Sequence, residues 1–245
     1  MINCLKADTL QLHTNMNLKL ENFICEHQDK TSPAGNKLPA EHVQAQANWI
    51  LQGSLPWMEL KGLDVPYKDM LAEARSLKHM FVGHRSEEGQ HQGWRSLCIH
   101  GIGATKTNVA ETYGLDSKTA KYDWTEIQDQ CPTTVKFFKE VFPYRHYMRL
   151  RFMLLEPGGY IMPHQDHHES MLGAAINISL NNPAGCKLVN THGTVPFRDE
   201  GSIFFFNNHY PHCVYNGSNE DRFHIIVHGG ADMERLAPLI VSSYG

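Results

Sequence analysis

The stretch that decides the fold is YMRLRFMLLEPGGYIMPH, residues 147–164. Its two apolar runs, 147–155 and 160–164, have the length of short strands, and Pro157-Gly158-Gly159 between them is typical of a turn. The same pattern of short strands and turn residues continues as far as residue 228. Further strands are predicted at 174–180, 186–189, 194–197, 202–206, 212–215 and 222–228. Strands at this spacing predict an antiparallel jelly roll of two facing sheets.

The residues before this stretch are predicted to be mainly helical or irregular. Apolar side chains recur at helical spacing after a proline in 39–51, 66–81 and 132–142, and 94–99 is typical of a strand. The predicted fold class is mainly β with flanking helices (α+β): a double-stranded β-helix (jelly roll or cupin-like) core with an N-terminal helical segment. We divide the chain into a buttressing N-terminal segment (1–89), the core (90–232) and a C-terminal tail (233–245).

Composition limits the functions that the chain can have. Its 245 residues carry 22 Lys and Arg against 26 Asp and Glu, a net charge of -4, which favours neither nucleic acid nor a membrane surface as a partner. No apolar run reaches the roughly 18 residues of a spanning helix, and no signal peptide is evident, so we expect a cytoplasmic protein. The six cysteines form no C-x-x-C pair. The 16 histidines are unusual, because histidine is the commonest metal ligand.

A histidine and an aspartate stand two residues apart at the end of the decisive stretch, in His164-Gln165-Asp166. Side chains at positions i and i+2 of an extended chain point to one face, so an imidazole and a carboxylate can reach one point. Ordinary polarity at a strand end is the alternative reading of so short a pattern. His164 and Asp166 are therefore candidate metal ligands that need a third partner.

A second group lies towards the C-terminus, where His212 begins a predicted strand and Arg222 follows ten residues later. If the chain reverses in a hairpin at 218–220, then His212, Asn216, Arg222 and His224 share one face. The two ends of this face are about 13 Å apart at ~3.3 Å per residue. A small dicarboxylate fits between them, with one end on a metal and the other on the guanidinium. Two histidines and one carboxylate form the site type of non-haem Fe(II) oxygenases.

These residues resemble a known superfamily. His164-x-Asp166, His212 and Arg222 on a double-stranded β-helix are similar to the pattern of the iron(II)- and 2-oxoglutarate-dependent oxygenases. Within that superfamily, three segments resemble the aspartyl/asparaginyl β-hydroxylase branch: Gly93-Trp94-Arg95-Ser96-Leu97, Leu155-Glu156-Pro157-Gly158-Gly159, and residues 216–222. The resemblance covers roughly residues 93–229, and the spacing of ten from histidine to arginine is its most specific element.

The resemblance implies an enzyme and assigns roles to its residues. His164, Asp166 and His212 would be the catalytic metal ligands for Fe(II), and Arg222 would pair with the C5 carboxylate of the cosubstrate 2-oxoglutarate. The implied reaction uses dioxygen to hydroxylate a C–H bond of an amino-acid-like or peptidyl substrate, and releases succinate and CO2. Some members of the branch lack the middle carboxylate, which is present here as Asp166.

Five further residues are candidates for binding the cosubstrate or an anionic substrate. On the strand after the H-x-D pattern, where members acting on peptide carboxylates carry basic residues, only Asn177 and Ser179 offer polar contacts, so hydroxylation of an Asp or Asn side chain is in doubt. His224 follows Arg222 on the same face. Arg149 and Arg151 alternate with apolar residues, so both can point into the barrel mouth and hold an anionic substrate or the cosubstrate; surface ion pairs are the alternative.

Two questions stay open at the level of sequence. His209 competes with His212 as third ligand, although only His212 has the spacing of ten to Arg222, and His167 and His168 can line the substrate mouth or lie in solvent. The alternative to an oxygenase is a cupin-like metal-binding or ligand-sensing protein that performs no oxidation. Such a protein needs no guanidinium set back from the metal, so substitution of Arg222 separates the two hypotheses.

Overall fold

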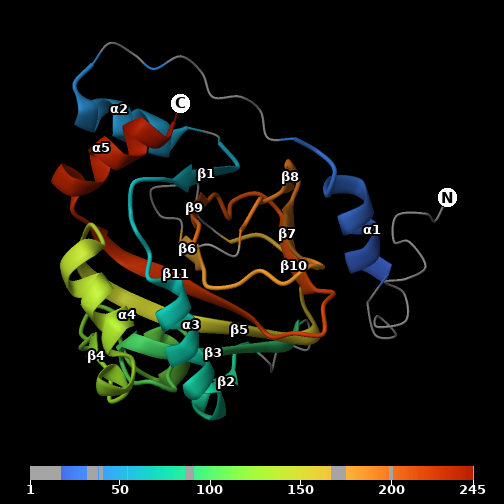
Figure 1. The fold of residues 1–245 in the computed structure, drawn as a ribbon, viewed down its shortest axis with the longest axis horizontal. Helices are drawn as coiled ribbons and strands as arrows, with labels where there is room; N and C mark the ends of the chain where they lie inside the picture. The colour runs from blue at the N-terminus through green and yellow to red at the C-terminus, as the bar shows by residue number, and fades with distance from the viewer. Residues whose placement is uncertain are drawn as a thin grey trace.

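The computed structural model describes residues 18–31, 38, 41–53, 55–85, 91–166, 175–198 and 201–244. Figure 1 shows a curled sheet with helices on its outer surfaces. The strands are β1 (Trp57–Leu60), β2 (Val82–Gly83), β3 (His91–Gly101), β4 (Asp123–Trp124), β5 (Tyr144–His164), β6 (Ile176–Ser179), β7 (Cys186–Asn190), β8 (Gly193–Thr194), β9 (Ile203–Phe206), β10 (His212–Asn216) and β11 (Arg222–Ala231). The α-helices are α1 (Leu18–His27), α2 (Val43–Gln52), α3 (Tyr67–Ser76), α4 (Pro132–Lys136) and α5 (Met233–Ser243).

The strands follow the order β1-β9-β6-β11-β5-β10-β7-β8, and β3 pairs with β5, β2 and β4. All of these pairs are antiparallel. In this order β5 connects two sets of strands, β1-β9-β6-β11 on one side and β10-β7-β8 on the other. This arrangement is the one expected of a double-stranded β-helix. The fold class predicted from the sequence is confirmed: a curled, mainly antiparallel sheet with a few flanking helices.

The predicted turn at Pro157-Gly158-Gly159 is wrong, because β5 continues through it from residue 144 to residue 164. The neighbouring strand β3 pairs with both halves of β5, Gln92 with Tyr160 and Trp94 with Leu155. The extra β5 residues between these pairs therefore form a bulge, and Gly158 takes a φ of 69° within it. Pairing with β3 on both sides of the bulge overrides the local turn chemistry.

The predicted hairpin between β10 and β11 is also wrong. Instead of pairing with each other, both strands pair with β5. In β10, His212 lies opposite His164, whereas in β11, Arg222 lies opposite Leu155. The two strands therefore run one after the other beside β5, and residues 217–221 form an excursion next to the bulge of β5. The spacing of about 13 Å, which assumed a hairpin, does not apply.

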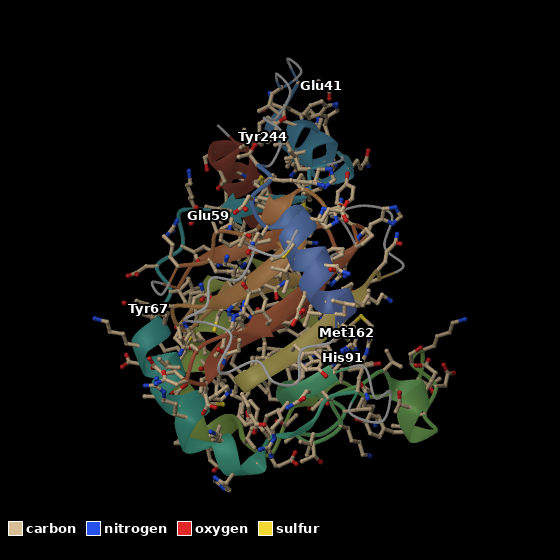
Figure 2. The ribbon with its side chains drawn as sticks, turned by 90° about the vertical axis from the view of Figure 1, so that its right-hand side faces the viewer. Glu41, Glu59, Tyr67, His91, Met162 and Tyr244 are labelled. Carbon is tan, nitrogen blue, oxygen red and sulfur yellow. The ribbon has the colours of Figure 1, made fainter. Side chains whose placement is uncertain are left out.

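Side chains of the central strands alternate between an inner and an outer face, as the period of two requires. The outward Phe152 of β5 and Ile225 of β11 belong to a core with the helices, together with Ile50 of α2 and Ile240 of α5. A smaller inner core includes Leu155, Ile161, Leu188, Phe204, Phe206 and Val214. On the other side, α1 covers the outer face of β10 and β7, as Figure 2 shows. The remaining inward side chains of β5 and β11 line a cavity.

The helices agree in part with the sequence predictions. The helix predicted at 66–81 is α3 followed by a 3-10 turn, and that predicted at 132–142 is α4 followed by a π-helical turn at Phe137–Val141. The segment expected as a C-terminal tail contains α5, which begins at an Asp232 N-cap and packs against α2 and β1 despite Pro238. Within the described ranges, no helix has both the length and the apolar character needed to cross a membrane.

Candidate functional site

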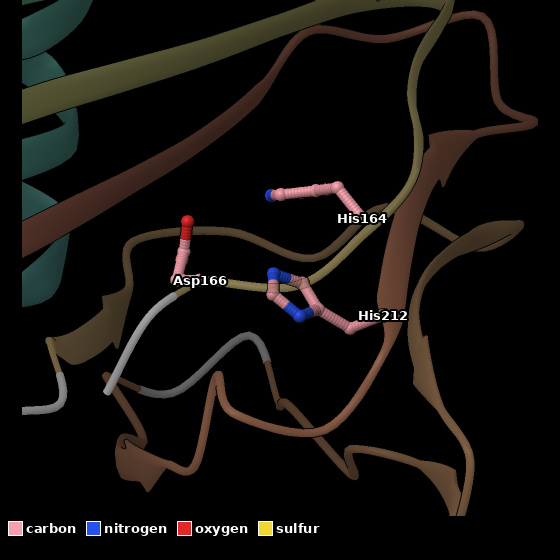
Figure 3. Close-up of side chains that lie close together, drawn as sticks. All are labelled: His164, Asp166 and His212. Atoms are coloured by element: carbon pink, nitrogen blue, oxygen red, sulfur yellow. The ribbon is translucent and has the colours of Figure 1, made fainter. Parts of the chain in front are cut away.

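Three side chains from two neighbouring strands converge at one end of β5. His164 ends β5, Asp166 follows two residues later, and His212 begins β10 directly opposite His164. One ligand atom from each side chain lies within 4.8 Å of the other two, and Figure 3 shows all three pointing to a common space. Two imidazoles and one carboxylate can occupy three adjacent positions of an octahedral metal ion. The structure thus brings together the three candidate ligands that the sequence analysis named.

The two histidines are oriented by the backbone. Nδ1 of His164 lies 2.9 Å from the carbonyl oxygen of Met162, and Nδ1 of His212 lies 2.9 Å from that of Tyr210. A carbonyl oxygen only accepts, so Nδ1 is the donor in both rings and Nε2 is left with its lone pair free for a metal. Burial, together with the neighbouring His164, lowers the pKa of His212 to about 4. The ring is therefore neutral near pH 7, the form that binds a metal.

Asn208, which the sequence analysis did not single out, fixes the carboxylate. Its side-chain Nδ2 donates to Oδ2 of Asp166 at 2.9 Å, and its carbonyl oxygen accepts from the backbone N–H of Asp166 at 3.0 Å. The loop before β10 therefore holds both the side chain and the backbone of Asp166. The only signal in the sequence is an Asn207-Asn208 pair, which is also ordinary turn composition.

The structure describes one of the three other histidines that the sequence analysis considered near the metal site, namely His209. His209 is half-buried and its Nδ1 lies 3.5 Å from the side-chain amide of Gln165. It does not belong to the cluster that contains His212. The spacing to Arg222 therefore selected the histidine that converges with His164 and Asp166. His167 and His168 lie outside the described residues.

The cluster opens into a cavity of about 340 Å³ between the two sets of strands. Arg222 of β11 lines this cavity and is only 7% exposed. Its Nε donates to Oδ1 of Asn182 at 3.3 Å, and its guanidinium carbon lies 5.5 Å from the centre of the Phe197 ring. No acidic side chain within the described ranges pairs with it. Burial lowers the pKa of Arg222 to about 10, so it stays charged near pH 7.

The other candidates for cosubstrate binding divide into two groups. Asn177, His224 and Arg149 line the cavity with the metal cluster and Arg222. Ser179 pairs with His224 in register but is fully buried and does not line the cavity. Asn216, which was expected on the same face, does not line the cavity either. It holds the excursion at 217–221, because its Nδ2 donates to the carbonyl oxygens of Leu155 and Glu220 at 2.9 and 2.7 Å.

Two of the three arginines of β5 also lie on the cavity side. Arg149 and Arg151 line the cavity, as their alternation with apolar residues predicted. The alternative of surface ion pairs finds no support, because neither has an acidic partner in the part of the chain that the structure describes. Arg151 is 4% exposed and donates from Nη1 to the carbonyl oxygen of Thr107 at 2.9 Å. The cavity therefore holds more positive charge than one cosubstrate carboxylate would use.

Comparison with known families agrees with this geometry. The sequence profile of the aspartyl/asparaginyl β-hydroxylases matches residues 66–230, well over half of the chain. The chain belongs to the aspartyl/asparaginyl β-hydroxylase family. As a member of this family it is an enzyme, a hydroxylating dioxygenase, which confirms the class of activity predicted from the sequence. No curated protein matches the chain.

Solved structures resemble the chain only distantly. A prolyl hydroxylase from Trichoplax adhaerens, in complex with a peptide fragment of a hypoxia-inducible factor, is 12% identical with a TM-score of 0.43, covering 79% of this chain and 92% of that one. A prolyl-4-hydroxylase from Pseudomonas putida is 14% identical with a TM-score of 0.42, covering 77% and 99%. A 2-oxoglutarate-Fe(II) oxygenase family protein from Burkholderia pseudomallei is 12% identical with a TM-score of 0.44, covering 82% and 99%. Likenesses this weak carry no argument about residues or substrates.

Proposed function

We propose that the protein hydroxylates a C–H bond of an amino-acid-like or peptidyl substrate with Fe(II) and 2-oxoglutarate. In this proposal His164, Asp166 and His212 hold the metal, and Arg222 pairs with the C5 carboxylate of 2-oxoglutarate. The observation that carries it is one cavity that contains both a cluster of three ligand atoms within 4.8 Å and a buried arginine without an acidic partner in the described chain.

The donor set fits Fe(II). Two neutral imidazoles and a carboxylate leave three positions of an octahedral ion open, which is the arrangement used by non-haem Fe(II) oxygenases. When bound, Fe(II) supplies the activation of dioxygen that is coupled to oxidative decarboxylation of 2-oxoglutarate. The chain contributes the orientation of the ligands, through the carbonyl oxygens of Met162 and Tyr210 and the side-chain amide of Asn208.

Arg222 and His224 are arranged to bind a carboxylate. A buried guanidinium without a counter-ion is costly, and a carboxylate matches its fork of donors. Nη2 of Arg222 lies 3.5 Å from Nδ1 of His224, which can only accept from it, so the proton of the imidazole is on Nε2. That Nε2 is buried and has no hydrogen-bond partner within the described chain. The carboxylate that pairs with Arg222 would also accept from His224.

Apolar side chains surround these polar groups. Leu155, Phe206 and Val214 line the cavity beside His212 and Arg222 and belong to the inner core. They keep water away from the space between the metal cluster and the guanidinium, which strengthens the electrostatic interactions there. The chain therefore provides a site in which a diacid and dioxygen can react with little competing water.

The proposal is tested by following labelled 2-oxoglutarate with the full chain, Fe(II) and air. We expect succinate and CO2 to form at a rate that depends on both oxygen and Fe(II), slowly even without a prime substrate. His212→Ala should abolish this conversion, and His209→Ala should leave it unchanged. A folded wild-type protein that forms no succinate, or a His212→Ala variant as active as the wild type, would contradict the proposal.

A further inference from the structure

Arg149 and Arg151, the two cavity-lining arginines of β5, are set back along the strand from the arginine that would bind the cosubstrate. Arg222 is opposite Leu155 in the pairing of β11 with β5, and the same register places Arg149 opposite His228, with no shift between them. Six residues of strand separate Leu155 from Arg149, which corresponds to about 20 Å at ~3.3 Å per residue. A five-carbon diacid held by Arg222 is much shorter than this. Arg149 therefore lines a part of the cavity that 2-oxoglutarate does not occupy, and Arg151, four residues from Leu155, lies about 13 Å from it along the strand at ~3.3 Å per residue.

The bonds of these two arginines leave donors unused. Besides its bond to Thr107, Arg151 reaches Nε2 of His84 at 3.4 Å from the same Nη1, while its Nε is buried and has no partner within the described chain. No hydrogen bond or ion pair joins Arg149 to any described residue. His84 carries no charge that could balance or add to that of Arg151, because burial and the charge of Arg151 lower its pKa and keep the ring neutral. Donors aimed into a cavity without internal acceptors are typical of a binding site.

The charges around the cavity lead to the same conclusion. Besides Arg85, three arginines line it, namely Arg149, Arg151 and Arg222, whereas Asp166 is its only acidic residue among those described. Fe(II) and the dianion of 2-oxoglutarate carry opposite charges of equal size, so binding both leaves this excess unchanged. Burial lowers the pKa of Arg151, and the like charge of Arg149 lowers it further, so the two guanidinium groups repel each other. A further anion would relieve this repulsion.

We propose that Arg149 and Arg151 form an anion-binding subsite that holds a carboxylate, or a similar oxyanion, of the prime substrate. The role in substrate binding rests on the proposed function, because the metal cluster defines which side of the cavity faces the reaction. Arg149, Arg151 and Asp166 line the same cavity, and the carboxylate of Asp166 acts electrostatically on Arg149, so this subsite is on the side of the cavity that holds the metal cluster. The substrate would then be an acidic molecule that reaches across the metal site with its anionic group on β5.

The binding test uses sulfate as a probe of the subsite. The full chain is loaded anaerobically with Fe(II) and 2-oxoglutarate and titrated calorimetrically with sulfate at constant ionic strength. We expect one saturable site, at least tenfold weaker in Arg149→Gln, partly restored in Arg149→Lys, and unchanged in Arg145→Gln. Arg145 is the matched control because it lies on the same strand but is exposed and paired with Asp232. Thermal unfolding shows whether each variant is folded.

Several results would overturn the inference. Wild-type protein without saturable sulfate binding, or equal binding by Arg149→Gln, contradicts an anion subsite on β5. Sulfate binding that is lost only in Arg222→Gln would assign the anion to the other end of the cavity. Failure of the proposed function is a separate result, since it appears as absence of oxygen-dependent succinate while sulfate binding persists.

Competition then identifies the chemical class of the ligand. Matched pairs of N-acetyl amino acids and their amides, together with a phosphorylated amino acid, are tested for displacement of sulfate. We expect the acids to displace it at least tenfold more effectively than the amides, and the order of carboxylate and phosphate to show which oxyanion fits. If the acids and amides displace sulfate equally, or if neither displaces it, the bound sulfate is an adventitious ion only, and this result would contradict the substrate assignment.

Discussion

The candidate metal cluster and two arginines of β5, Arg149 and Arg151, line the same cavity but differ in how their polar groups are satisfied. At the metal cluster, His164, His212 and Asp166 each have a hydrogen-bond partner within the chain that fixes the orientation of the side chain. Arg149 and Arg151 have donors that no described residue satisfies. Groups with internal partners are prepared to hold a small, fixed ligand such as a metal ion. Groups without them indicate that the missing partner is a molecule from solution.

The largest expected effect comes from breaking the metal cluster itself. We expect His212→Ala to weaken Fe(II) binding by at least about 100-fold and to abolish succinate formation, because one of three protein ligands is lost. Metal affinity is measured by anaerobic titration, with His209→Ala, in the loop just before β10, as the control. If His209→Ala loses the metal while His212→Ala keeps it, the third ligand is His209, and its assignment to His212 is contradicted.

The next effect is at Arg222, the proposed partner of the cosubstrate. Arg222→Gln should raise the KM for 2-oxoglutarate by about 100-fold, equivalent to ~2.7 kcal/mol, because a buried charge pair is replaced by neutral groups. Fe(II) affinity should change little, since Arg222 is not a ligand. Steady-state kinetics with varied 2-oxoglutarate checks this, and Arg198→Gln, in an exposed pair with Glu59, serves as the control. An unchanged KM would support a metal-binding protein of another kind.

A smaller effect tests whether internal partners matter at the metal end. Asn208→Ala removes the donor to Asp166, and we expect metal affinity to fall by about 10- to 100-fold while the protein stays folded. The sign of a positioning role is that Asn208→Asp, which cannot donate to an ionised carboxylate, weakens metal binding as well. If both variants bind Fe(II) as the wild type does, the orientation of Asp166 does not depend on Asn208.

The last prediction concerns the excursion that lets β10 and β11 both run beside β5. Asn216→Ala leaves the carbonyl oxygens of Leu155 and Glu220 without their donor, and we expect the free energy of unfolding to fall by about 2–3 kcal/mol. Urea denaturation measures this change. The exposed neighbour Asn219 is the control, and Asn219→Ala should stay within about 0.5 kcal/mol of the wild type. Equal stabilities would mean that the excursion does not depend on Asn216.

The sequence was sufficient where the information is local. The H-x-D pattern put His164 and Asp166 on one side of an extended chain, and the alternation of apolar residues in β5 predicted that Arg149 and Arg151 point into the barrel. The spacing of ten selected His212 and Arg222, although the hairpin used to justify it does not exist. Both residues reach the cavity because β10 and β11 follow each other along β5.

Sequence reasoning failed where distant segments decide the structure. Pro157-Gly158-Gly159 has the composition of a turn, but β3 pairs on both sides of it and keeps β5 continuous; a Cβ on Gly159 would lie 2.9 Å from the carbonyl oxygen of Gln92. Asn208 reaches Asp166 across 42 positions of sequence, which no local pattern reveals. In α5, Pro238 obscured a helix that the cap at Asp232 could have indicated.

The central claim is that His164, Asp166 and His212 bind one Fe(II) ion beside a 2-oxoglutarate held by Arg222. Anaerobic absorption spectroscopy tests it most directly, because a 2-oxo acid chelated to Fe(II) gives a visible charge-transfer band. We expect the band when Fe(II) and 2-oxoglutarate are added to the full chain, no band in His212→Ala, and a band in Arg222→Gln only at much higher 2-oxoglutarate. Folded wild-type protein that gives no band under these conditions would contradict the claim.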